Sequence, residues 1–163
     1  MKQYNNYTAD DFTFVVCAYQ ECEYLEEAIR SVKEQTISAK ILISTSTPND
    51  FIQGIADRYD IPVCVNRDGG QIKDYNFAMA LPETPLMMLM HQDEILAPAF
   101  LEKVLDALNH AKDPIIAFTN YLEMHNDEVD KKPSTMVRIK RMLLWPSLVH
   151  AWQGTWIGKR GIQ

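Results

Sequence analysis

The sequence predicts an α/β protein built on a mainly parallel β-sheet with helices on both faces. Short apolar runs alternate with stretches whose apolar residues recur at i, i+3, i+4 and i+7, the period of one helix face. Strands separated by helices imply right-handed crossovers between parallel strands. In addition, the uncharged run Leu86–Met90 is typical of a strand that is buried on both sides of a sheet.

The first strand and helix follow from the composition near the amino terminus. Phe12–Cys17 is rich in aromatic and β-branched residues, which favour strands. A short loop, Ala18–Glu21, comes next, and a helix is predicted from Glu23 to near Gln35. Its apolar stripe consists of Leu25, Ala28, Ile29 and Val32.

The second and third strands are predicted at Ile41–Ile43 and Pro62–Val65. Between them, Ser44–Thr47 has the composition of a polar turn. Thr47 and Pro48 suit the N-cap and the first position of a helix. The stripe of that helix consists of Ile52, Ile55, Ala56 and Tyr59.

The later elements continue the same alternation. Gly69-Gly70 marks a sharp turn before a short helix over Gln71–Leu81. Beyond the strand at Leu86, Pro98 suits the first position of another helix, and a fifth strand is predicted over Ile115–Tyr121. The stripe of this last helix consists of Leu101, Val104, Leu105 and Leu108. A polar turn at Asn126-Asp127 predicts a hairpin that forms an antiparallel edge of the sheet.

Length and cysteine usage indicate one ordinary domain. A chain of 163 residues buries roughly 70% of the surface that its unfolded form exposes. Cys17, Cys22 and Cys64 are odd in number and lack CxxC spacing, so neither a disulfide framework nor a zinc site is indicated. The amino terminus has no apolar core of a signal peptide, and no run approaches the ~20 apolar residues of a membrane span. We therefore expect a soluble, cytoplasmic protein.

The charge is distributed unevenly along the chain. Residues 1–130 hold 22 acidic and nine basic residues, a net charge of −13, whereas residues 131–163 hold seven basic residues and no acid. This contrast divides the chain into a body, residues 1–130, and a basic segment, residues 131–163. The basic segment holds all three tryptophans and an amphipathic stretch, Met136–Leu144. Two roles stay open for it: neutralising the acidic body, or facing an anionic ligand.

The polar cluster His91–Glu94 follows the most apolar strand at its carboxyl end, which is where open α/β sheets bind ligands. Carboxylates suit hard divalent cations, which bridge them to phosphate. Mg²⁺ or Mn²⁺ would fit here, with Asp93 as the favoured ligand and Glu94 as a second candidate. The alternative is that Asp93 caps a turn or the helix that follows.

The order of these elements resembles the family-2 glycosyltransferases of the GT-A fold. The resemblance runs from Phe12 to about Val129. It rests on a strand ending in a Tyr-polar-acidic loop, a helix ending in Gln-Thr, a strand running into a Ser/Thr turn, a Gly-Gly loop and an apolar strand ending in acids. The resemblance implies a GT-A-like, Rossmann-like three-layer sandwich that binds a nucleotide-diphosphate sugar.

The resemblance also implies roles for individual residues. The metal motif of the family falls on His91-Gln92-Asp93, so Asp93 and His91 are the implied ligands of Mn²⁺ or Mg²⁺. The loop Ala18–Glu21 is implied to hold the base and ribose. The nucleotide-sugar site is expected to comprise Ala18, Tyr19, Glu21, Ser44, Asp68, Lys73 and Gln92. The Gln-Asp form of the motif looks like that of transferases that use deoxysugars such as rhamnose.

Three positions depart from the pattern of the family. Ser44-Thr45 stands where the family usually has Asp-Asp to grip the base, so uracil specificity is left open. Tyr75-Asn76 replaces Arg-Asn, which removes a cation that could face phosphate, and Lys73 lies two residues before the replaced position. His91 replaces the first acid of the metal motif, although imidazole suits Mg²⁺ less well than carboxylate.

The implied activity is transfer of a hexosyl or deoxyhexosyl group to a glycan or lipid-linked acceptor, as in polysaccharide biosynthesis. Peripheral membrane association stays open, and no nucleic-acid partner is expected. In this family the general base is a carboxylate well downstream of the metal motif, and here no Asp or Glu follows Asp130. Gly154–Arg160 resembles the acceptor-side loop that precedes the base. We therefore expect residues 131–163 to be the truncated start of the acceptor-side region, no catalytic residue to be assignable, and this chain to transfer no sugar.

Two other functions remain open from the sequence. The first is a non-catalytic domain that binds a nucleotide sugar or a glycan. The second is a doubly wound regulatory domain in which Asp93 is merely acidic. No GxGxxG follows the first strand and no GxxxxGK[ST] occurs, which argues against dinucleotide and P-loop binding.

Overall fold

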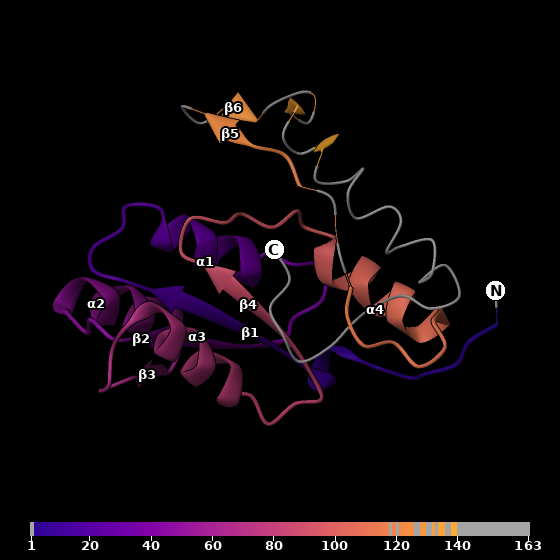
Figure 1. Cartoon of the computed structure of the whole chain (residues 1–163), viewed down its shortest axis with the longest axis horizontal. Helices are drawn as coiled ribbons and strands as arrows, with labels where there is room; N and C mark the ends of the chain where they lie inside the picture. Colours follow the sequence, from indigo (N-terminus) through magenta and orange to yellow (C-terminus); the bar gives the residue numbers. More distant parts are fainter. Residues whose placement is uncertain are drawn as a thin grey trace.

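A computed structural model describes residues 2–117, 119, 121–125, 128, 129, 132, 134, 135, 138 and 139. Figure 1 shows their arrangement. In chain order, the elements are η1 (Ala9–Asp11), β1 (Phe12–Ala18), α1 (Leu25–Lys33), β2 (Lys40–Thr45), α2 (Asp50–Tyr59), β3 (Val63–Val65), α3 (Gln71–Ala80), β4 (Leu86–His91), α4 (Phe100–His110), β5 (Met124–His125) and β6 (Glu128–Val129). Four predicted features lie largely or wholly outside the described residues. They are the boundary at residue 130, the stretch Met136–Leu144, the three tryptophans and Gly154–Arg160.

The central sheet has four parallel strands in the order β3-β2-β1-β4. Helices cover both of its faces, so the predicted three-layer α/β sandwich is confirmed (Figure 1). Successive residues of a strand point to opposite faces. Phe14 and Val16 accordingly pack with α1, α2 and α4, whereas Val15 packs with α3 on the other face.

The helical stripes predicted from the sequence form the larger part of the core. Every stripe residue of α1 and α4 is buried, and so are Ile52, Ile55 and Ala56 of α2. All five apolar residues at Leu86–Met90 are buried as predicted. Gly69 and Gly70 both have positive φ, which explains why glycines occupy the turn into α3.

Two predicted helix starts were wrong. Asn49, rather than Thr47, is the N-cap of α2, and its Oδ1 accepts from the Ile52 N–H at 2.9 Å. Helix α4 begins at Phe100, two residues after Pro98. No local side chain caps α4, and the Leu101 N–H donates instead to Oε1 of Gln35 from α1 at 3.0 Å.

The strand predictions were wrong in two places. β2 continues through Ser44 and Thr45, which pair with Cys17 and Ala18 of β1. Over residues 115–121 the described residues contain no strand beyond an isolated bridge at Ile116. The hairpin around residues 126–127 does form, as β5 and β6. It is a separate two-stranded sheet and not an edge of the central one.

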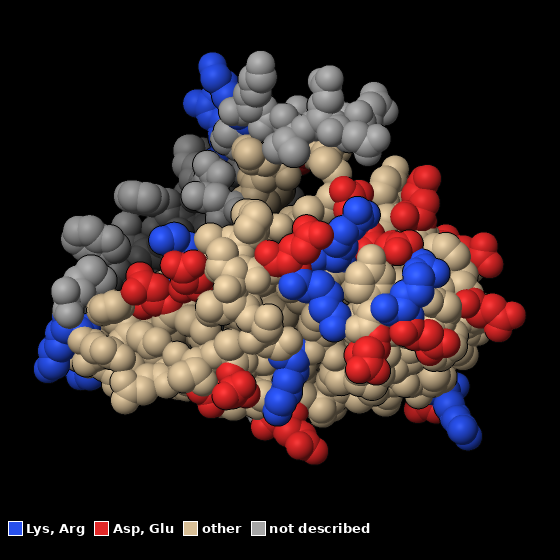
Figure 2. Space-filling view, turned by 180° about the vertical axis from the view of Figure 1, so that it is seen from behind, with Lys and Arg blue, Asp and Glu red and all other residues tan. Residues whose placement is uncertain are grey.

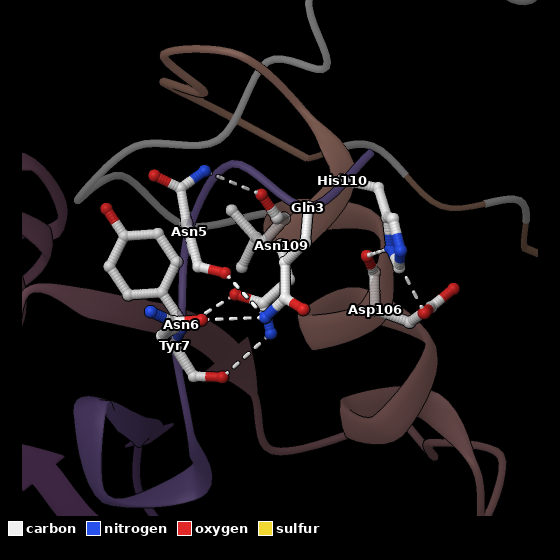
Figure 3. Close-up of polar contacts among 8 residues, drawn as sticks. Gln3, Asn5, Asn6, Tyr7, Asp106, Asn109 and His110 are labelled. Atoms are coloured by element: carbon white, nitrogen blue, oxygen red, sulfur yellow. Dashed lines mark hydrogen bonds and ion pairs between the residues drawn. The ribbon is translucent and has the colours of Figure 1, made fainter. Parts of the chain in front are cut away.

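The segment before β1 binds the end of α4, about a hundred residues later in the chain (Figure 3). Asn5 Nδ2 donates to the carbonyls of Leu108 at 3.0 Å and Ala111 at 2.8 Å. Asn109 exchanges two hydrogen bonds with the backbone of Tyr7, at 2.7 and 2.9 Å. The Asn5 contacts satisfy carbonyl groups that the last turn of a helix leaves without partners.

The described surface carries mixed charge. On the face shown in Figure 2, acidic and basic side chains lie interspersed. One exposed ion pair, between Arg58 and Glu26 at 2.8 Å, links α2 to α1. No helix among the described residues has the length and apolar character needed to cross a membrane.

Candidate functional site

The carboxyl ends of the four strands bring several predicted site residues to one edge of the sheet. Cys17 of β1 lies in register with Ser44 of β2 and His91 of β4. The residues just beyond the strands therefore emerge side by side. They are Tyr19 after β1, Ser46 after β2, Asn66 after β3 and Gln92 after β4.

Gln92 joins the end of β4 to the loop after β1. Its Oε1 accepts from the Tyr19 N–H at 2.8 Å, and its Nε2 donates to the Tyr19 carbonyl at 3.1 Å. Both polar ends of the amide therefore bind the backbone of one residue. The Tyr19 side chain is left 54% exposed.

Thr47 holds the same loop from the side of β2. Its hydroxyl oxygen accepts from the Gln20 N–H at 2.6 Å, and its own N–H donates to Oγ1 of Thr45 at 3.0 Å. Gln20 has φ 56°, in the left-handed region. Thr47, predicted as a helix cap, instead fixes a sharp bend in the loop after β1.

Asp74 in the first turn of α3 joins the ends of β2 and β3. Its carboxylate accepts from Ser46 Oγ at 2.8 Å and from Asn66 Nδ2 at 2.7 Å. Asn66 is buried, and its Oδ1 accepts from the Asp68 N–H at 3.2 Å. Sequence reasoning missed Ser46, Asn66 and Asp74. An acid in the first turn after Gly69-Gly70 was the available signal for Asp74.

The acidic turn after β4 is closed by Glu94 rather than by Asp93. Glu94 Oε2 accepts from the His91 N–H at 3.1 Å, and the Glu94 N–H donates to the His91 carbonyl at 3.3 Å. Burial raises the pKa of Glu94, although its hydrogen bond with the His91 N–H opposes the rise. Asp93 is exposed, so of the two acids it is the one presented to solvent.

The chain beyond this turn is held by the carboxyl-terminal end of α1. Gln35 Nε2 donates to the Ala97 carbonyl at 2.9 Å, and the Thr36 N–H donates to the Pro98 carbonyl at 2.8 Å. Ser31 Oγ accepts from the Leu96 N–H at 3.1 Å. Asp93 thus lies in a turn between β4, which precedes it, and the segment Leu96–Pro98, which is held by the end of α1.

The donor set at this edge fits a cation that shares its ligands with phosphate. Among the described residues, no group of three His, Cys, Asp or Glu side chains is placed to hold a metal by itself. Mg²⁺ is commonly bound through one or two carboxylates, with phosphates and waters completing its shell. An exposed carboxylate at Asp93 meets that requirement.

Several predicted site residues lie elsewhere than expected. The side chain of Ala18 is buried in the main core, so only its backbone faces the edge. Ser44 lies within β2 and is 4% exposed, not in a loop, because the parallel pairing continues past it. The His91 ring packs edge-on against Tyr75 of α3, with 5.6 Å between ring centroids.

The remaining predicted residues are accessible at or near the edge. Tyr19, Glu21, Asp68 and Lys73 are exposed, and Gln92 is half-buried. The ligand roles of these residues, and the metal roles of Asp93 and His91, stay predictions.

Comparison with known proteins gives one family and one set of similar folds. The model of the family described as Glycosyl transferase family 2 matches residues 13–162. No curated protein matches the sequence.

Solved structures of TarS from S. aureus have a similar fold. The structure of TarS 1-349 in complex with UDP has a TM-score of 0.60 and 15% identity, over 77% of this chain and 38% of that one. The complex with UDP-GlcNAc has the same TM-score and identity, over 77% of this chain and 37% of that one. A further TarS structure has a TM-score of 0.54 and 17% identity, over 71% of this chain and 23% of that one. The chain thus spans less than two fifths of the length of these proteins.

Proposed function

Because the chain belongs to glycosyl transferase family 2, we propose that its strand-end edge binds a nucleotide-diphosphate sugar and presents the sugar for transfer. The observation that carries the proposal is the convergence of Tyr19, Ser46, Asn66 and Gln92 on the edge that also carries Asp93. Ligands of open α/β sheets bind at this edge. The UDP and UDP-GlcNAc complexes of TarS, which has a similar fold, support the same class of donor.

The edge offers different chemistry at its two ends. The side of β1, β2 and β3 presents an aromatic ring, polar side chains and the exposed carboxylates of Glu21 and Asp68, a set that suits a nucleobase and the hydroxyl groups of ribose. The β4 side presents the carboxylate of Asp93, with the imidazole of His91 as the second candidate ligand. Mn²⁺ or Mg²⁺ held there would neutralise the diphosphate and stabilise the departing nucleotide. Asp93 has the exposure that such a ligand needs.

We further propose that the acceptor is a glycan or a lipid-linked sugar and that the donor is a hexose or deoxyhexose, within polysaccharide biosynthesis. The seven basic residues after residue 130 are suited to an anionic acceptor or to a membrane surface, which is the basis for peripheral membrane association. Non-catalytic binding of a nucleotide sugar is the second candidate.

Thermal unfolding with nucleotides tests the donor site. UDP or dTDP should raise Tm only with Mn²⁺ or Mg²⁺, because a cation is needed between the diphosphate and the acidic edge. A nucleotide at about 100 times its Kd contributes about 2.7 kcal/mol, or roughly 5–10 °C in a domain of this size. Asp93→Ala should abolish the rise.

Asp10→Ala is the matched control, because Asp10 is exposed and precedes β1 at the opposite edge of the sheet. It should respond to nucleotide as the unmodified protein does. An equal rise with EDTA present, or a normal response of Asp93→Ala, would exclude the metal assignment. No response of the unmodified protein to any nucleotide would exclude the donor site.

A further inference from the structure

The amide of Gln92 pairs with Tyr19 in the way that one strand residue pairs with another. It accepts from the N–H and donates to the carbonyl of the same residue, at 2.8 and 3.1 Å. In a parallel ladder a residue likewise gives both its N–H and its carbonyl to the neighbouring strand, although two different residues of that strand receive them. The side chain of Gln92 therefore continues the β1–β4 pairing beyond the last paired residues, Cys17 and His91.

The loop that Gln92 holds has little else to fix it. In the part of the chain that the structure describes, Thr47 supplies the other hydrogen bond to this loop, at Gln20. The side chains of Tyr19, Gln20 and Glu21 are all exposed, so apolar burial does not anchor them. The location of the Tyr19 ring consequently depends on two side chains from the segments that follow β2 and β4.

We propose that Gln92 is a positioning residue that fixes the Tyr19 ring as a stacking surface for the nucleobase of the donor. The inference rests on the proposed function, and it replaces the direct ligand contact predicted for Gln92 from the sequence. Bases stack on exposed aromatic faces with little dependence on sequence. Because Gln92 directly precedes Asp93, the same contact joins the base side of the edge to the metal side.

Binding measurements on a double-mutant cycle test this role. Gln92→Met keeps the length of the side chain but removes both hydrogen bonds. Two bonds of ordinary net strength correspond to a loss of UDP affinity of about thirtyfold with Mn²⁺ present. Tyr19→Ala should weaken binding by a similar factor. The double variant should be no more than about twofold weaker than the weaker single variant, because Gln92 acts through the Tyr19 ring.

The control is Gln53→Met, since Gln53 is an exposed residue on α2 whose amide binds only Asp57 of its own helix among the described residues. It should leave UDP affinity unchanged. Losses that multiply in the double variant would overturn the proposal, because Gln92 would then contact the ligand independently of Tyr19. Unchanged affinity of Gln92→Met would overturn it as well.

Amide hydrogen exchange tests the contact between Gln92 and the Tyr19 backbone in the absence of nucleotide. The Tyr19 amide should be protected in the unmodified protein and should exchange at least about tenfold faster in Gln92→Met, with β1 unchanged. An unprotected Tyr19 amide in the unmodified protein would overturn the contact itself. Failure of the unmodified protein to bind UDP, with a protected Tyr19 amide, would overturn the donor assignment and the stacking role while leaving the contact in place.

Discussion

Cys17 shows how the surroundings of a single residue set its chemistry. It lies near the end of β1, in register with Ser44 and His91. Burial is the main cause that raises the pKa of its thiol to about 12, and the carboxylates of Asp74 and Glu94 add to the rise. The thiol at the centre of the strand-end edge is therefore neutral, and it adds no charge that would oppose a diphosphate.

Alkylation of the native protein checks this shift. At pH 8 the thiolate fraction of Cys17 should be roughly a thousandfold below that of a thiol of ordinary pKa, since the thiolate is the reactive form. Iodoacetamide should label Cys17 far more slowly in the native protein than in urea, as measured by mass spectrometry of the peptides. Equal rates in the two states would contradict the expectation.

The raised pKa of Cys17 also determines how the stability of the protein changes with pH. The folded-state pKa of Cys17 lies above its ordinary value of 9.0, so its contribution to stability is complete below pH 9.0 and is lost as the pH rises toward about 12.

At the scale of elements, α4 depends on partners that are remote in sequence at both ends. Gln35 of α1 binds the Leu101 N–H at its start, and the segment before β1 binds the carbonyls at its end. No capping residue is adjacent in the sequence. This explains why Pro98 was a poor guide to the start of the helix.

Asn5→Ala should destabilise the protein by about 1–2 kcal/mol. The substitution removes the hydrogen bonds to the Leu108 and Ala111 carbonyls and leaves both partly buried groups without that partner. Urea unfolding should show a lower midpoint with an unchanged slope.

Asn6→Ala is the matched control for this measurement. Asn6 is exposed and accepts from Gln3 Nε2 at 2.7 Å, within the same short segment. Its loss should change stability by less than about 0.5 kcal/mol. A loss as large as that of Asn5→Ala would show that the contact with α4 is not what stabilises the segment.

The elements that sequence reasoning placed well are those specified by local periodicity. The stripes of α1, α2 and α4 and the apolar run of β4 are properties of neighbouring residues. The predicted strand at 115–121 had suitable composition, but Ile115 is 63% exposed in the structure. Strand pairing depends on which edge of the sheet is free, and the amino-acid composition of a segment does not specify this.

At the scale of the whole molecule, the candidate site was predicted in outline but not in its connections. Parallel topology alone places the ends of β1, β2, β3 and β4 at one edge, so the predicted loops lie close together there. The contact of Asp74 with Ser46 and Asn66 could not be predicted, because it depends on where α3 packs. The polarity of Gln92 predicted a contact with the ligand. Its hydrogen bonds to the Tyr19 backbone depend on the tertiary structure and could not be predicted.

We expect the 163-residue chain to bind its donor without transferring the sugar. A general base must take the proton of the attacking hydroxyl, and no Asp or Glu follows Asp130. Turnover with a panel of sugar nucleotides and glycan acceptors should show slow donor hydrolysis at most. Measurable transfer by the unmodified chain would refute this expectation. His150 is the one histidine of residues 131–163, so transfer that persists in His150→Ala would assign the base to an upstream acid such as Glu94 or Glu123.

The position of β1 between β2 and β4 has a consequence for the chain as it is synthesised. β2 becomes available soon after β1, but the other edge of β1 has no partner until residues 86–91 are made. At 5–20 residues per second, roughly 2–9 s pass between completion of β2 and completion of β4. During that interval the nascent chain presents an unpaired apolar strand edge, a surface that favours aggregation and that chaperones recognise.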